Sequence, residues 1–243
     1  AHLDSDGAHV NLLDTPGYPD FLGRTLSVLA AVETVAVVIN ARSGIESITQ
    51  RAMQAAYNRG LCRMIIVNQI DAPGFDGASL VAQIQGQFGA ECLPINLPAD
   101  GASKVLDCFF QPGGEGADFS SVEAAHERLV DQVVEVDEEL MELYLEQGQE
   151  LAPEQLHDPF EEALREGHLI PIAFVSAETG AGIRELLNIF SKLMPNPAEG
   201  NPPPFMKGEG AKMELVEVSP DPDQHALAHV FKIVNDPFRG KLG

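Results

Sequence analysis

The sequence predicts an α/β protein built on a doubly wound parallel sheet. Three short apolar runs, at residues 35–39, 64–67 and 172–175, are typical of strands buried on both faces of such a sheet. Segments with apolar residues at helical spacing lie between these runs. Polar residues follow directly where strands are expected to end, as at Asn68 and Ser176. Together these observations favour alternating strands and helices.

The first 88 residues contain the expected alternation of strands and helices. Alternating apolar residues around the dipeptide Asp6-Gly7 predict two short strands joined by a tight turn. The second strand is expected over residues 10–13, ending at Asp14. The elements expected next are a helix over 21–30, the strand 35–39, a helix over 47–59 that ends at Gly60, the strand 64–67 and a helix over 78–88.

The middle of the chain has a different pattern of apolar and charged residues. A strand is expected over 105–110, followed by a Gly-rich loop and a long acidic helical region with one apolar face. Residues 115–166 contain 17 acidic and 2 basic side chains, so they hold 15 of the 22 net negative charges. A solvated helical face explains such a run, and an interaction surface is the alternative.

The α/β pattern returns with the strand 172–175 and an amphipathic helix over 183–193. Residues 195–222 are rich in Pro, Gly, Asn and Glu, which predicts an interdomain linker. A last strand is expected over 228–234.

Composition excludes several classes of function. With 243 residues and 44% apolar side chains, the chain can bury a sizeable core. The net charge of −22 argues against free nucleic acid or an anionic membrane as an electrostatic partner. Its 3 cysteines have no Cys-x-x-Cys spacing, which argues against a disulfide framework or a cysteine zinc site and favours a reducing cytoplasm. Nothing at Ala1 reads as a signal peptide, and the absent Met indicates a cut start.

Three polar clusters at predicted strand ends suit a guanine nucleotide, because ligands bind at the carboxyl edge of such sheets. Asp14 can reach Mg²⁺ through water, and Gly17 can offer an unobstructed N–H to a terminal phosphate. Asp71 can accept both the ring N–H and the exocyclic amine of guanine, which adenine cannot supply. Asn68 can tie the base loop together, and a backbone N–H near Ala177 can donate to the guanine carbonyl.

The three clusters, in this order, resemble the translational GTPases, and within them elongation factor G and its elongation-factor-G-like relatives. Three sequence stretches are similar to the third, fourth and fifth GTPase motifs of that family: Asp14-Thr15-Pro16-Gly17-Tyr18, Asn68-Gln69-Ile70-Asp71 and Ser176-Ala177. The long gap between the last two is similar to the place where elongation factor G carries an inserted subdomain. The stretch from Val230 to Leu242 resembles the start of the family's second, barrel-forming domain.

The resemblance implies a P-loop-GTPase-type sheet that is truncated at its N-terminus, with GTP or GDP and Mg²⁺ as cofactors. The implied divisions are a GTPase domain at 1–94 and 167–198, an acidic α+β insert at 95–166, a linker at 199–224 and the start of a β-barrel domain at 225–243. The implied partner of the parent protein is the ribosome, both rRNA and stalk proteins. The implied activity is GTP hydrolysis coupled to ribosomal translocation.

Some features depart from the family pattern. The phosphate-cradling loop is expected before Ala1, so this chain alone is not expected to hydrolyse GTP. Tyr18 stands where elongation factor G has a histidine beside the attacking water, and Gln69 replaces the lysine that covers the guanine ring. His225 and His229 lack a metal-site pattern. A non-hydrolysing protein-binding module and a ribosomal protection protein remain alternatives.

Overall fold

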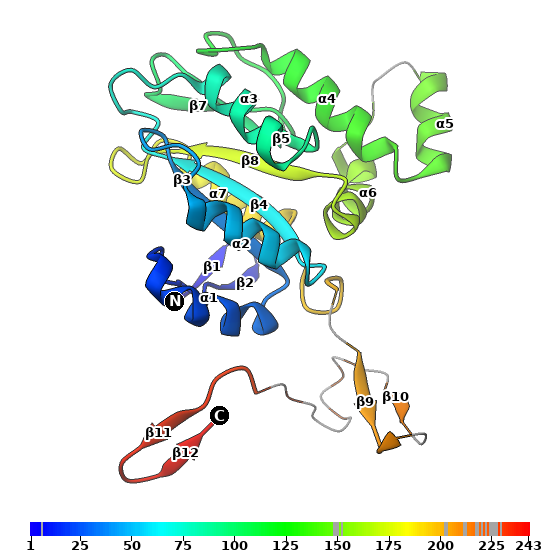
Figure 1. Ribbon diagram of the computed structural model, residues 1–243. Helices are drawn as coiled ribbons and strands as arrows, with labels where there is room; N and C mark the ends of the chain where they lie inside the picture. Colours follow the sequence, from blue (N-terminus) through cyan, green and yellow to red (C-terminus); the bar gives the residue numbers. More distant parts are fainter. Residues whose placement is uncertain are drawn as a thin grey trace.

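The centre of the protein is a four-stranded parallel sheet (Figure 1). The computed structural model describes residues 1–5, 7–147, 151, 153–201, 204–210, 213–216, 219, 221, 223, 228 and 230–243. The strands lie in the order β3 (Thr34–Asn40), β4 (Cys62–Asn68), β8 (Ile170–Val175) and β5 (Cys92–Pro94), and every neighbouring pair is parallel. The predicted α/β class with a parallel sheet is confirmed.

Helices cover both faces of this sheet, because the residues of β4 alternate between two cores. Ile65 and Val67 pack in one core with residues of α2 (Ser47–Tyr57) and α3 (Gly77–Phe88). Met64 and Ile66 pack in the other core with residues of α4 (Val122–Val134), α6 (Pro153–Glu166) and α7 (Ile183–Lys192). Strands buried on both faces in this way need continuous apolar runs, which is what the sequence contains.

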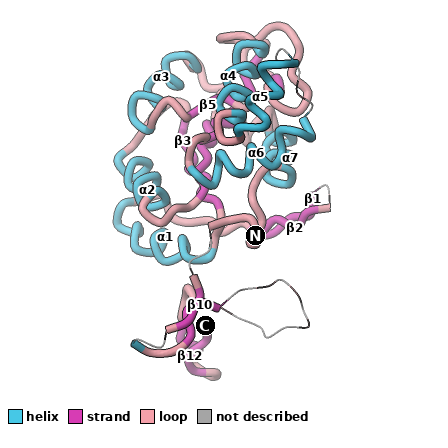
Figure 2. The backbone as a smooth tube through the Cα atoms, turned by 90° about the vertical axis from the view of Figure 1, so that its right-hand side faces the viewer, coloured by secondary structure: helices cyan, strands magenta, loops and turns pink. Residues whose placement is uncertain are grey.

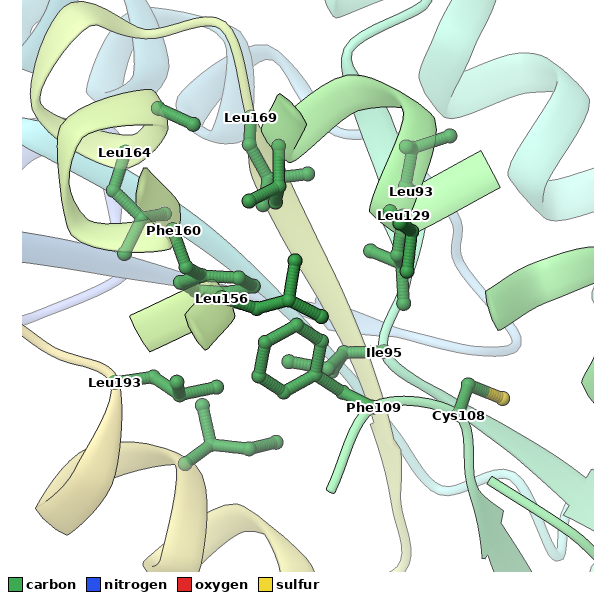
Figure 3. Close-up of a cluster of buried hydrophobic side chains, with 14 of the residues drawn as sticks. Leu93, Ile95, Cys108, Phe109, Leu129, Leu156, Phe160, Leu164, Leu169 and Leu193 are labelled. Atoms are coloured by element: carbon green, nitrogen blue, oxygen red, sulfur yellow. The ribbon is translucent and has the colours of Figure 1, made fainter. Parts of the chain in front are cut away.

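The acidic middle segment packs into the second core. It contains the antiparallel strands β6 (Asn96–Ala99) and β7 (Lys104–Asp107), followed by α4, α5 (Glu138–Gln147) and α6. Figure 3 shows Phe109 and Phe160 in contact, and their ring centroids are 4.7 Å apart. The apolar faces of the acidic helices are therefore buried in this core, with α4 and α6 against the sheet and α5 against α4, and their charged faces are left to solvent.

The N-terminal hairpin differs from the prediction. Strands β1 (His2–Ser5) and β2 (Ala8–Asn11) form a separate two-stranded antiparallel sheet. The second strand ends at Asn11, so the expectation that it covers 10–13 and ends at Asp14 was wrong. Beyond it, the Leu12 N–H donates to the Ala1 carbonyl at 2.8 Å. The expected helix follows as α1 (Leu22–Val28), flanked by 3-10 turns at Pro19–Phe21 and Leu29–Ala31.

The C-terminal part contains two further hairpins, which lie apart from the sheet in Figure 1. One, within the expected linker, joins β9 (Phe205–Lys207) to β10 (Glu214–Val216), and the other joins β11 (Val234–Asp236) to β12 (Gly240–Leu242). The strand expected over 228–234 was wrong for 228 and 230–233, and the ladder runs from Val234 to the turn after Asp236. Asp236 accepts from the Phe238 and Arg239 N–H groups at 2.8 and 2.7 Å and so holds that turn.

The backbone tube in Figure 2 shows the same separation of the helical part from the last strands. His225 and His229 lie outside the described residues. Among the described residues, no helix has the length and apolar character required to cross a membrane. The domain boundaries and the barrel assignment stay predictions.

Candidate functional site

Two of the three predicted polar clusters meet at the carboxyl ends of neighbouring strands. Asn68 ends β4, and Ser176 follows β8 directly, with Asn68 paired opposite Val175. The Asn68 Oδ1 atom accepts from the N–H of Gln69 at 2.8 Å and from the N–H of Ala177 at 3.0 Å. One side chain therefore joins loops that lie 109 residues apart in sequence.

The loop after β4 is held in a defined conformation. Gln69 has a φ of +66°, and its Oε1 accepts from the Asn40 Nδ2 atom at 3.0 Å. Ile70 is buried, and its N–H donates to the Val175 carbonyl at 3.3 Å. The sequence analysis did not include Asn40, although it ends the first buried strand just as Asn68 ends the second. That shared position was the signal that could have found it.

Asp71 is exposed at the mouth of a cavity of about 620 Å³. The cavity lies between the loop after β4 and the inserted segment, and Asp76, Asp118 and Phe119 also line it. The other two carboxylates are engaged by backbone N–H groups. Asp76 caps α3 through the Ser79 N–H at 3.0 Å, and Asp118 accepts from residues 101 and 102 at 2.8 and 2.7 Å. Within the described residues, the Asp71 carboxylate has no hydrogen-bond partner, so it is available to a ligand.

The loop after β8 is a tight turn built on a buried serine. The Ser176 N–H donates to the Ala181 carbonyl at 2.8 Å, and its Oγ accepts from the Thr179 N–H at 3.2 Å. Gly182 has a φ of +75°, and a Cβ atom there would meet the Phe174 carbonyl, so this position requires glycine. The Ala177 N–H donates to Asn68. The next N–H along, that of Glu178, has no acceptor among the described residues.

Asn96 is a second positioning residue that the sequence analysis missed. It is 1% exposed, and its side chain pairs with the backbone of Phe174. The Nδ2 atom donates to the Phe174 carbonyl at 3.1 Å, and Oδ1 accepts from the Phe174 N–H at 2.7 Å. This pairing supports β8 beyond the point where β5 ends, just before the Ser176 turn.

The first polar cluster is not joined to the other two. Asp14, Gly17 and Tyr18 are exposed, Tyr18 by 74%, while Thr15 and Pro16 are half-buried. No hydrogen bond links the side chains of Asp14 or Tyr18 to either loop within the described part of the chain. Across those same residues, no group of three His, Cys, Asp or Glu side chains forms a metal site. A lone exposed carboxylate such as Asp14 fits Mg²⁺ only as part of a shell completed by water and phosphate oxygens.

Comparison with known proteins identifies similar sequences and structures. The family model of the elongation factor Tu GTP binding domain matches residues 1–196. The chain is 30% identical to elongation factor G-like proteins of Mycobacterium tuberculosis, strains CDC 1551 / Oshkosh and H37Rv, over 100% of this chain and 35% of each relative. A crystal structure of a Thermus thermophilus protein matches with a TM-score of 0.74 and 32% identity, over 99% of this chain and 35% of that one. The chain thus spans about a third of the length of these proteins.

Proposed function

Because this chain belongs to the family of elongation factor Tu GTP-binding domains, we propose that it is the guanine-nucleotide-binding part of a translational GTPase that acts on the ribosome in translocation. The observation that carries the proposal is the Asn68 bridge. It holds the loop of Asp71 beside the Ser176 turn, and both loops lie at the carboxyl edge where α/β sheets bind ligands.

Asp71 selects the base in this proposal. Its free carboxylate accepts from the ring N–H and the exocyclic amine of guanine, an arrangement that adenine cannot match. The Ala177 N–H already donates to Asn68. The free N–H of Glu178, the next residue of the turn after Ser176, therefore donates to the guanine carbonyl. Gln69 lies along the ring, and its amide is oriented by Asn40.

The phosphate side is assigned to the first cluster. Asp14 holds Mg²⁺ through water, Thr15 and Pro16 shape the loop, Gly17 offers its N–H to the γ-phosphate, and Tyr18 lies beside the attacking water.

The acidic helices of the insert form a contact surface for the ribosome in this proposal. Their apolar faces are already used in the core with Phe109 and Phe160, so their outward charged faces are the part available to a partner. Ribosomal stalk proteins and rRNA are the partners proposed for the whole protein. The cytoplasm is the compartment that follows from this role.

The test is calorimetric titration of the folded chain with GDP and ADP. GDP is expected to bind more tightly than ADP. Asp71→Asn is expected to weaken GDP binding by roughly 10- to 150-fold, because the amide oxygen still accepts from the ring N–H, whereas the charge-assisted hydrogen bond from the exocyclic amine is lost. The same variant should gain affinity for xanthosine diphosphate, whose 2-oxo group accepts from the new amide.

Asp76→Asn is the matched control, because Asp76 lines the same cavity and asparagine can still cap α3. It should leave the preference for GDP unchanged. Equal binding of GDP and ADP by the unsubstituted chain, or an equal loss of GDP affinity in both variants, would contradict the assignment of Asp71.

A further inference from the structure

A buried arginine lies at the opposite end of the sheet from the candidate nucleotide site. Arg63 is the second residue of β4, an otherwise apolar strand, and is only 9% exposed. It alternates with Ile65 and Val67, so its side chain faces the layer of α2 and α3. Five residues of strand separate it from Asn68, which is about 16 Å at 3.3 Å per residue.

Among the described residues, the Arg63 guanidinium has no anionic partner. It lies over the Tyr57 ring, 5.2 Å from the ring centroid, and this cation–π contact offsets only a small part of the free-energy cost of burying the charge. No ion pair and no hydrogen-bond acceptor is found for its N–H groups among the described residues. Arginine keeps its charge at any physiological pH, and a buried charge without a partner is costly. These donors therefore require an acceptor from solvent or from a ligand.

Arg63 lines an open cavity of about 470 Å³ beside the last turns of α2 and the end of α3. Arg51 lines the same cavity, together with the amide side chains of Gln50 and Gln87. Neither amide is engaged in a hydrogen bond within the described part of the chain. Glu91 is the one carboxylate of the lining, so the two arginines leave one net positive charge, in a chain of net charge −22.

We propose that this cavity binds an oxyanion, a phosphate or carboxylate group carried by a small ligand. The planar guanidinium of Arg63 presents paired N–H donors that match such a group, and Arg51 and the two amides supply further donors around it. The site lies at the amino ends of the strands. It is therefore separate from the nucleotide site, and it does not rest on the proposed function.

The experiment is a titration of the whole chain followed by NMR of the arginine Nε–Hε signals. The probes are sodium phosphate and sodium succinate, each at an ionic strength matched with sodium chloride. The Arg63 signal is expected to shift saturably, with a dissociation constant on the order of 1 mM. Saturation by phosphate alone assigns a phosphate ligand, saturation by succinate alone assigns a carboxylate, and saturation by both assigns the shared chemistry.

Variants separate specific binding from general charge. Arg63→Lys keeps the charge but loses the paired donors of the guanidinium, and it should weaken binding about tenfold when the titration is followed at the Arg51 Nε–Hε signal. Arg51→Gln should weaken it less, about threefold, because Arg51 is exposed. Arg24→Gln is the matched control, since its guanidinium also lies over a ring, 5.3 Å from the centroid of Phe21, but outside the cavity.

The proposal is overturned if neither anion saturates the Arg63 signal, or if the Arg63→Lys and Arg24→Gln variants bind equally well. Should Arg63→Lys fail to fold, the Arg63 signal of the unsubstituted chain and the Arg51→Gln titration decide the same question. Asp71→Asn should leave this binding unchanged, so a failure here is distinguishable from a failure of the nucleotide assignment.

Discussion

Replacing Asn96 by alanine removes the side chain that substitutes for a strand beside Phe174. The pairing of β5 with β8 ends at Ile172, so the N–H and C=O of Phe174 depend on Asn96 at 2.7 and 3.1 Å. Asn96 is 1% exposed, and Phe174 is fully buried. Leaving two buried backbone groups without partners costs about 1–3 kcal/mol each, so we expect Asn96→Ala to lower the free energy of unfolding by about 2–6 kcal/mol.

Equilibrium unfolding in urea at pH 7 measures this free energy. Asn58→Ala is the control, because Asn58 is exposed and, among the described residues, its side chain accepts only from that of Gln54, at 2.9 Å. Its effect is expected to be within about 0.5 kcal/mol. An Asn96→Ala variant as stable as the control, with an unchanged dependence on urea, would refute the reasoning. If that variant does not fold, slow hydrogen exchange at the Phe174 amide of the unsubstituted chain is the equivalent measurement.

Three further predictions concern other residues. Asn68→Ala should speed hydrogen exchange at the Ala177 amide by roughly two- to tenfold, because its acceptor is removed; an unchanged exchange rate would count against the bridge. Burial and the nearby Glu199 carboxylate raise the pKa of Glu161 above 4.5 in the folded protein. The stability that the protonated Glu161 contributes is therefore full below pH 4.5 and is lost as pH rises through the folded pKa. Glu161→Gln should therefore raise the Tm at pH 7 but not at pH 4, and equal gains at both would contradict this. Burial also raises the pKa of three thiols to about 11 or 12, those of Cys62, Cys92 and Cys108. At pH 8 a disulfide reagent should therefore label them only as fast as the protein opens. Rapid labelling of the folded protein would contradict this.

Local sequence was sufficient for the elements whose signals are local. The strands β3, β4 and β8 follow from continuous apolar runs, and α2 and α3 follow from helical spacing and the stops at their ends. The polar residues Asn68 and Ser176 could be placed at strand ends for the same reason. In contrast, β5 is only three residues long and includes Pro94, so no periodicity could reveal it.

Local sequence did not determine the register and the pairing of the strands. The second N-terminal strand was expected to reach Asp14, but it stops at Asn11. The start of β11 was also misplaced, since its ladder begins at Val234 and not within the apolar run before it. A hydrophobic pattern alone does not contain this information.

By itself, then, the sequence determined which residues end the buried strands and which chemistry they offer to a ligand. Only the tertiary structure decided which strands are neighbours, and with that, which of these residues meet. Asn68 reaches Ala177 across 109 residues, and Asn96 reaches Phe174 across 78, because β8 returns to the sheet between β4 and β5 after the whole inserted segment. Such contacts depend on how distant apolar faces pack together, and a local pattern does not record that packing.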